Sequence, residues 1–294
     1  MQLPNFIIGG ALKCGTTSLF YQLDQHPEVF MCEPKEPRYF LYEIAQAEQS
    51  DKRALNFPAR TLEEYAALFE GSAGFKAIGE ASAHYFNWPA IAPKIKDTLL
   101  DVKIIFMLRN PIDRAYSHYL HAVRIGAENR PVEEGLAVTE SRISLGCYAE
   151  KLETWFATID SKQTKIIIFD DFVKNGLHVF ADVCRFLDID DSFTPDLSVQ
   201  NKGGRVKNQR LDLFLEKVKS HPLRKTINPL VPKSIRAAFK DMRQRNMEKA
   251  PPLPPAIVLQ LSDYYKDDIK RLETLIDRDL SAWLDGAFVP NPSG

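Results

Sequence analysis

A short apolar strand that leads through a loop of small residues into a helix constrains this chain more than any other feature. Residues 6–9 predict the strand, residues 10–15 the loop and residues 16–25 the helix. In such an arrangement the backbone N–H groups of the loop and the positive end of the helix point at one place, where a phosphate binds. The sequence therefore predicts an α/β fold with a P-loop-type phosphate-binding loop after the first strand.

The loop departs from two common nucleotide-binding motifs. Gly10 and Gly15 have the Walker A spacing, but Thr16 stands where that motif has its lysine, and Lys13 lies two residues before the second glycine. The loop is not a Gly-x-Gly-x-x-Gly dinucleotide fingerprint either. A P-loop nucleotide kinase or NTPase is therefore an alternative that the missing Gly-Lys-Thr disfavours. Because a lysine, a glycine and three hydroxyl residues meet at one helix start, we expect an anion site.

The rest of the chain alternates short apolar runs with helical patterns, which is typical of a mostly parallel sheet with helices on both faces. We expect further strands at residues 75–78, 102–108 and 165–169, and helices at residues 61–71, 91–100, 146–159 and 176–187. The run 102–108 is almost continuously apolar, as in a strand buried on both faces. A capping box at Thr61 and an Asn110–Pro111 pair mark two helix starts.

The whole chain, residues 1–294, is expected to form one domain. Residues 201–250 hold 14 Lys and Arg against 4 Asp and Glu, and prolines make the segment 201–255 irregular. Residues 256–284 then predict a terminal helix with an apolar stripe that packs on the core.

Charge, cysteines and hydropathy exclude several classes of protein. The net charge of −1 gives no indication of a nucleic-acid partner. Four scattered cysteines fit a reducing, cytoplasmic location better than a disulfide framework. The longest apolar runs fall far short of the ~20 residues of a membrane span. We therefore expect either a cytosolic protein or a catalytic domain cut from a longer chain.

Four segments resemble sulfotransferases that use 3′-phosphoadenosine 5′-phosphosulfate (PAPS). Lys-Cys-Gly-Thr-Thr-Ser-Leu at 13–19 is similar to the family's 5′-phosphosulfate loop, and residues 108–119 resemble its 3′-phosphate motif, Arg-Asn-Pro followed by a helix with a serine. Residues 146–152 match a Gly-x-Tyr-Ala helix of bacterial members, and residues 265–284 resemble the terminal helix. The resemblance is to the bacterial and heparan-type branches, and it covers almost the whole chain.

The resemblance implies PAPS as the donor and 3′-phosphoadenosine 5′-phosphate (PAP) as the product. No metal is expected, because the strand at 102–108 ends in Arg109, which would repel one. The residues that would hold the donor's 5′ end are Lys13, Cys14, Gly15, Thr16, Thr17 and Ser18. Arg109 and Ser117 would hold the 3′-phosphate, since a guanidinium binds phosphate through two hydrogen bonds. Tyr148, in the Gly-x-Tyr-Ala helix, is also expected to bind the nucleotide. Segment 201–255 would supply nucleotide-side and acceptor-side loops, with these binding residues: Lys202, Gly203, Gly204, Arg205 and Lys207.

An acceptor hydroxyl needs a general base, and the candidates are Glu36, Glu80, His84 and His118. Heparan-type sulfotransferases carry their base glutamate shortly after the first helix, before two aromatic residues, and Glu36 matches that pattern. Glycosaminoglycan enzymes have a lysine where this chain has Ala81, which disfavours a polyanionic sugar acceptor and leaves His84 as a helper or substitute base. Lys13 would stabilise the leaving phosphate.

The expected activity is O-sulfation of an acceptor whose identity stays open. A sugar, a lipid, a small metabolite and a hydroxyacyl chain on an acyl carrier protein all fit, the last if the chain is an excised domain. Besides a kinase or NTPase, a non-catalytic domain that binds adenosine bisphosphate remains an alternative.

Overall fold

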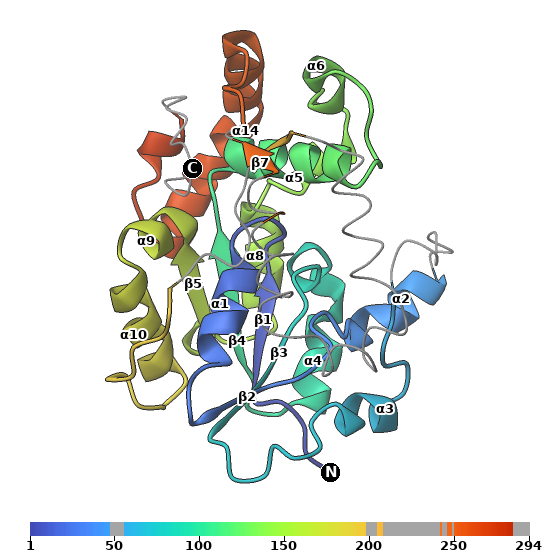
Figure 1. Ribbon diagram of the computed structural model, residues 1–294, viewed down its shortest axis with the longest axis vertical. Helices are drawn as coiled ribbons and strands as arrows, with labels where there is room; N and C mark the ends of the chain where they lie inside the picture. Colours follow the sequence, from blue (N-terminus) through green and yellow to red (C-terminus); the bar gives the residue numbers. More distant parts are fainter. Residues whose placement is uncertain (48–55, 198–204, 208–241, 243–245, 249, 285–294) are drawn as a thin grey trace.

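Five parallel strands form the central sheet of the computed structural model, which describes residues 1–47, 56–197, 205–207, 242, 246–248 and 250–284 (Figure 1). The strands are β1 (Phe6–Gly10), β2 (Val29–Met31), β3 (Ala77–Ala81), β4 (Lys103–Leu108) and β5 (Thr164–Ile168). Their order across the sheet is β2-β3-β1-β4-β5, and every neighbouring pair is parallel. The first strand therefore lies in the middle of the sheet.

Helices and short turns connect these strands. The helices are α1 (Thr16–Leu23), α2 (Tyr42–Ala47), α3 (Leu62–Ala67), α4 (Ala92–Thr98), α5 (Pro111–Arg124), α6 (Val132–Gly135), α7 (Ser141–Ser144), α8 (Ala149–Phe156), α9 (Phe169–Lys174), α10 (Gly176–Phe186) and α14 (Pro255–Ile276). The 3₁₀ turns are η1 (Tyr39–Leu41), η2 (Tyr85–Asn87), η3 (Pro89–Ile91), η4 (Ser161–Gln163) and η6 (Ser281–Trp283). A small antiparallel pair, β6 (Arg205–Val206) with β7 (Met247–Glu248), lies against α5.

Both faces of the sheet are covered, as the apolar runs predict. Every residue of β1 and β3 is buried. Because successive side chains of a strand point to opposite faces, this burial requires packing on each side. Packing is tight enough that a Cβ on Gly79 would lie 2.1 Å from the Phe6 ring. The predicted α/β fold is confirmed.

Local signals predict the starts of two helices correctly. Thr61 and Glu64 form the capping box of α3, and the Asn110 side chain accepts a hydrogen bond from the Ile112 N–H at the start of α5. The apolar stripe of α14 is buried in the core, through Ile257, Leu261, Tyr265, Ile269 and Leu272.

Several expected boundaries were wrong. The strand expected at 75–78 is β3, Ala77–Ala81, because Phe75 is half exposed and still in the turn from Gly74. The helix expected from residue 146 begins at Ala149, since the Asp268 carboxylate of α14 accepts hydrogen bonds from the Tyr148 and Ala149 N–H groups. The helix expected to end at Gly71 ends at Ala67. The terminal helix expected to run to residue 284 ends at Ile276, because Asp277 has a left-handed conformation that stops it, and only the short turn η6 follows.

Candidate active site

The candidate site lies at the edge of the sheet where β1, β3 and β4 end. Their register places Ile8 beside Ala81 and Gly10 beside Phe106. In a parallel sheet all carboxyl ends meet at one edge, and ligands bind in the crevice outside it. Three segments therefore come together here: the loop after β1, the residues after β3 and the residue after β4. In the sequence they lie up to about a hundred positions apart.

The loop between β1 and α1 is held to β4 and opens the helix N-terminus toward this edge. The Ala11 N–H donates to Met107 O (2.8 Å), and the Cys14 N–H donates back to Ala11 O (3.3 Å). Gly15 precedes the helix with φ of 95°, and a Cβ there would lie 2.9 Å from the Phe169 ring, so glycine is required. Among the described residues, no side chain caps α1 and no acidic residue lies in its first turn. Its positive end is available to an anion.

Lys13 lies half-buried in this loop among other cations. Burial, together with the positive charges of Arg124 and Arg109, lowers the pKa of Lys13 to about 8. The Lys13 side chain is thus mostly protonated at neutral pH. Its positive charge has an electrostatic cost that a bound anion would relieve.

Arg109 follows β4 and is fixed from two sides. Its guanidinium stacks over the Phe169 ring at 4.7 Å, and Nη2 lies 3.9 Å from the Asp113 carboxylate. Burial raises the pKa of Asp113 to about 6, against the opposing effect of Arg109. The Nε atom of Arg109 is buried and has no hydrogen-bond partner among the described residues. The side chain is positioned for a further acceptor.

The α5 helix, which starts at Asn110–Pro111, contributes Ser117 and two histidines. Ser117 is half-buried. The pKa of His118 is lowered to about 3, mainly by burial and then by the charges of Arg114 and Lys13. The pKa of His121 is lowered to about 4, again mainly by burial and then by the charges of Lys13 and Arg124. The positive charges of α5 and of Lys13 thus lie close enough to disfavour one another.

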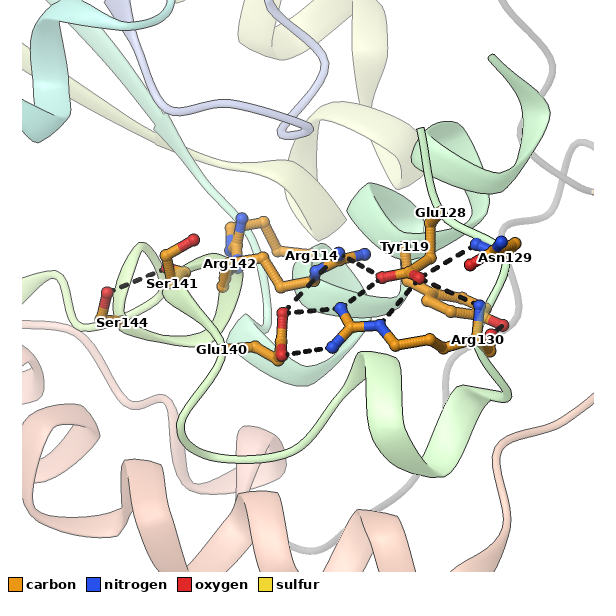
Figure 2. Close-up of polar contacts among 9 residues, drawn as sticks. All are labelled: Arg114, Tyr119, Glu128, Asn129, Arg130, Glu140, Ser141, Arg142 and Ser144. Atoms are coloured by element: carbon orange, nitrogen blue, oxygen red, sulfur yellow. Dashed lines mark hydrogen bonds and ion pairs between the residues drawn. The ribbon is translucent and has the colours of Figure 1, made fainter. Parts of the chain in front are cut away.

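Arg114 of α5 has its contact inside the fold. It is fully buried, and its Nη2 donates to the carbonyl of Arg142, while Asp113 pairs with Arg109. Figure 2 shows the network beside it, in which Glu128 and Glu140 bind Arg130 and Arg142. This network holds the segment between α5 and α8, residues 125–148, against α5.

Glu36 lies at the same edge, after β2, within a group of donors. Lys35 Nζ (2.9 Å), Arg38 Nε (3.4 Å) and the Ala83 N–H (3.2 Å) reach its carboxylate, and His84 Nδ1 is 3.5 Å away. Burial alone would raise the pKa of Glu36, but His84 and Lys35 together lower it to about 2. The sequence predicts Glu36 and His84 as separate candidates and does not predict that they meet. It also does not predict that Lys35 and Arg38 contact the Glu36 carboxylate, although they lie one and two positions from it.

Glu80 lies beneath this group and is fully buried. Its carboxylate accepts hydrogen bonds from the hydroxyls of Ser82 (2.7 Å), Tyr65 (2.8 Å) and Tyr85 (3.1 Å). Burial raises its pKa to about 7. Enclosed in this way, Glu80 cannot contact an acceptor, which leaves Glu36, His84 and His118 as the candidate bases nearer the edge.

Two further expected residues lie apart from the open edge. Tyr148 is fully buried behind the loop, where its hydroxyl donates to Arg109 O (2.9 Å) and lies 3.9 Å from Cys14 Sγ. Lys207 is exposed, and its N–H donates to Asn246 O. Arg205 is in β6, and Lys202, Gly203 and Gly204 lie outside the described residues, as does most of segment 201–255.

Within the described part of the chain, no group of three or more His, Cys, Asp and Glu residues could hold a metal ion. None of the described helices is both long and apolar enough to cross a bilayer.

Comparison with known proteins decides the family. A family model described as "Sulfotransferase domain" matches residues 3–272. This chain belongs to the sulfotransferase family. A solved sulfotransferase from Alicyclobacillus acidocaldarius shares 29% sequence identity with it, with a TM-score of 0.71 over 96% of this chain and 99% of that one. The predicted resemblance and the α/β sulfotransferase fold are both confirmed.

Two curated relatives match parts of this sulfotransferase. The membrane-associated sulfotransferase kil1 of Dictyostelium discoideum is 36% identical over 122 residues, which are 42% of this chain and 24% of that protein. Human carbohydrate sulfotransferase 15 is 26% identical over 250 residues, 64% of this chain and 44% of that protein. The matches thus span less than half the length of either relative.

Proposed function

We propose that this sulfotransferase moves the sulfuryl group of PAPS to a hydroxyl group of an acceptor, with Lys13 on the donor side and Glu36 as general base. The observation that carries the proposal is the division of one sheet edge into two parts. Lys13, Arg109 and the α1 N-terminus form a cationic part, and Glu36 with His84 forms a part with a carboxylate and an imidazole.

The cationic part fits a ligand with a phosphosulfate at one end and a phosphate at the other. Two buried nitrogen atoms, Arg109 Nε and His118 Nδ1, have no hydrogen-bond partner among the described residues. Burial, and then several neighbouring cations, lower the pKa values of Lys13, His118 and His121. A polyanion would relieve that repulsion and accept those hydrogen bonds. We assign the 3′-phosphate to Arg109 and Ser117, and the 5′ end to the loop 13–18.

When bound, PAPS would supply an activated sulfuryl group whose leaving group is the 5′-phosphate of PAP. In the transfer, the acceptor oxygen bonds to sulfur while the bond between sulfur and the phosphate oxygen breaks. Lys13 and the first N–H groups of α1 stabilise the charge that develops on that oxygen, which is the kind of contribution that lowers a barrier most. Arg109 keeps the nucleotide in place.

Glu36 takes the proton of the acceptor hydroxyl. Its low pKa keeps it ionised at neutral pH, and the hydroxyl becomes acidic as its oxygen bonds to sulfur, so a weakly basic carboxylate accepts the proton late in the step. His84, 3.5 Å away, orients the carboxylate. The curated relative named a carbohydrate sulfotransferase makes sugars a first acceptor class to test.

The experiment is a transfer assay with sulfur-labelled PAPS and a panel of acceptors: a neutral sugar, a polyanionic glycosaminoglycan, a long-chain alcohol, a hydroxyacyl carrier protein and an amino sugar. We expect label on a hydroxyl acceptor, and a Lys13→Ala variant should lower turnover about 10²–10³-fold, as for removal of a transition-state donor. Label on the amine alone would contradict O-sulfation. PAP binding without any transfer would support a non-catalytic domain.

A further inference from the structure

The buried Glu80 carboxylate holds three hydroxyl groups in fixed directions. Oε1 accepts from Tyr65 and Tyr85, at 2.8 and 3.1 Å, and Oε2 accepts from Ser82 at 2.7 Å. A hydroxyl has one proton and two lone pairs. Since each proton is donated to Glu80, the lone pairs of these oxygens are left to accept hydrogen bonds from elsewhere.

Two of the three hydroxyls use their lone pairs on the segment that carries Glu36. The Arg38 N–H donates to Ser82 Oγ (3.0 Å), and the Phe40 N–H donates to the Tyr85 hydroxyl oxygen (3.3 Å). Among the described residues, the third hydroxyl, on Tyr65, donates to Glu80 and has no hydrogen bond to this segment. Glu80 therefore fixes the backbone at Arg38 through the Ser82 hydroxyl, and the backbone at Phe40 through the Tyr85 hydroxyl. Both positions lie just after Glu36.

The segment needs such external restraint. Glu36 and Arg38 both have positive φ, 68° and 54°, a left-handed conformation that non-glycine residues adopt at a cost. The surrounding structure holds this backbone: the Glu36 N–H donates to Ala81 O (2.9 Å), and the Ala83 N–H donates to the Glu36 carboxylate. Strained backbone persists only where its neighbours determine it.

We propose that Glu80 is a positioning residue, which places the Glu36 carboxylate at the sheet edge through the hydroxyls of Ser82 and Tyr85. This inference rests on the proposed function, because it matters for transfer only if Glu36 is the base. It also explains why a carboxylate is kept in the core, where burial raises its pKa to about 7. An apolar residue there would leave the hydroxyls free to turn their protons toward the backbone N–H groups.

The test compares Ser82→Ala with Tyr65→Phe. Each variant removes one hydrogen bond to Glu80, but only the first also removes an acceptor for the Glu36 segment. We expect Ser82→Ala to speed amide hydrogen exchange at Arg38 and to lower kcat about tenfold, with the Kd of PAP unchanged. Tyr65→Phe should change the Arg38 exchange and kcat less than twofold. Glu80→Gln should have the same effects on Arg38 exchange, kcat and the Kd of PAP as Ser82→Ala. If Glu80→Gln does not fold, Ser82→Ala alone tests the inference.

A double-mutant cycle separates positioning from general damage to the fold. In a Glu36→Gln background, Ser82→Ala should have no further effect on kcat, since there is no base left to place. Equal losses in Ser82→Ala and Tyr65→Phe, or additive losses in the cycle, would overturn the inference while leaving the proposed function intact. Full turnover in Glu36→Gln itself would instead overturn the role of Glu36, and this inference with it.

Discussion

The carboxylate of Glu36 lies 3.5 Å from His84 Nδ1, although 48 positions separate the two residues in the sequence. Glu36 follows β2 and His84 follows β3, and these strands are hydrogen-bonded neighbours in the sheet. The Glu36 carboxylate, with a pKa of about 2, is ionised at neutral pH and has an imidazole beside it. The roles that we propose for the two residues in transfer differ accordingly.

Glu36→Gln should lower kcat about 10²–10⁴-fold, because the amide keeps the shape of the side chain but cannot take a proton. His84→Ala should lower kcat much less, since it removes only an orienting contact. Steady-state transfer from labelled PAPS measures both, and the Kd of PAP is the control that should stay unchanged. Near-normal turnover in Glu36→Gln together with inactive His84→Ala would identify His84 as the base.

Binding of PAP at pH 8.5 should be accompanied by proton uptake at Lys13. The pKa of Lys13 in the free protein is about 8, so the amine is largely neutral at this pH, and a bound phosphate raises its pKa. Linkage then predicts an uptake of roughly 0.7 proton per PAP. Calorimetry in two buffers of different ionisation enthalpy measures it. A Lys13→Arg variant should bind PAP without this uptake, and equal uptake in both proteins would place the proton elsewhere.

Arg109→Ala should weaken PAP binding and leave AMP binding nearly unchanged. A charge-assisted hydrogen bond to phosphate contributes roughly 1.5–3 kcal/mol, or about 10- to 100-fold in Kd, and AMP lacks the 3′-phosphate that Arg109 is proposed to bind. Titration calorimetry with both ligands is the measurement. Equal losses for PAP and AMP would mean that Arg109 acts on the fold through its stacking on Phe169.

PAP should bind in the presence of EDTA and raise the melting temperature by mass action. We expect the cations of the site to supply the charge that a metal ion supplies in kinases. Thermal scans with PAP, AMP and either EDTA or Mg²⁺ test this. Stabilisation that requires Mg²⁺, or that is equal for PAP and AMP, would contradict the assignment of two phosphate positions.

Glu128→Gln should lower the melting temperature by several degrees at pH 7 and by much less near pH 3. Hydrogen bonds from Arg130 are the main cause that lowers the pKa of Glu128 from 4.5 to about 2 (Figure 2). A carboxyl with a lowered folded-state pKa contributes stability above its unfolded pKa and loses it as the pH falls toward the folded value. Glu134→Gln, an exposed change on α6, is the control. A pH-independent difference between Glu128→Gln and the unmodified protein would mean that the charge of Glu128 is not responsible.

The sequence by itself determined the features that depend on neighbouring residues. The strand–loop–helix around Lys13, the helix start at Asn110 and the capping box at Thr61 all follow from contacts within about four positions. The buried runs of β1 and β4 likewise predict strands covered on both faces, because almost every side chain in them is apolar. The motifs that identify the family are local in the same sense.

Only the tertiary structure decided which distant residues meet. It placed His84 beside Glu36, buried Glu80 beneath them, stacked Arg109 on Phe169 and started α8 with a carboxylate from α14. These relations join elements tens to more than a hundred positions apart. Those at the strand ends arise from the parallel order β2-β3-β1-β4-β5, which brings the carboxyl ends of the strands to one edge. Strand order is set by packing of the whole sheet, because parallel neighbours need long crossovers, and no short pattern encodes it.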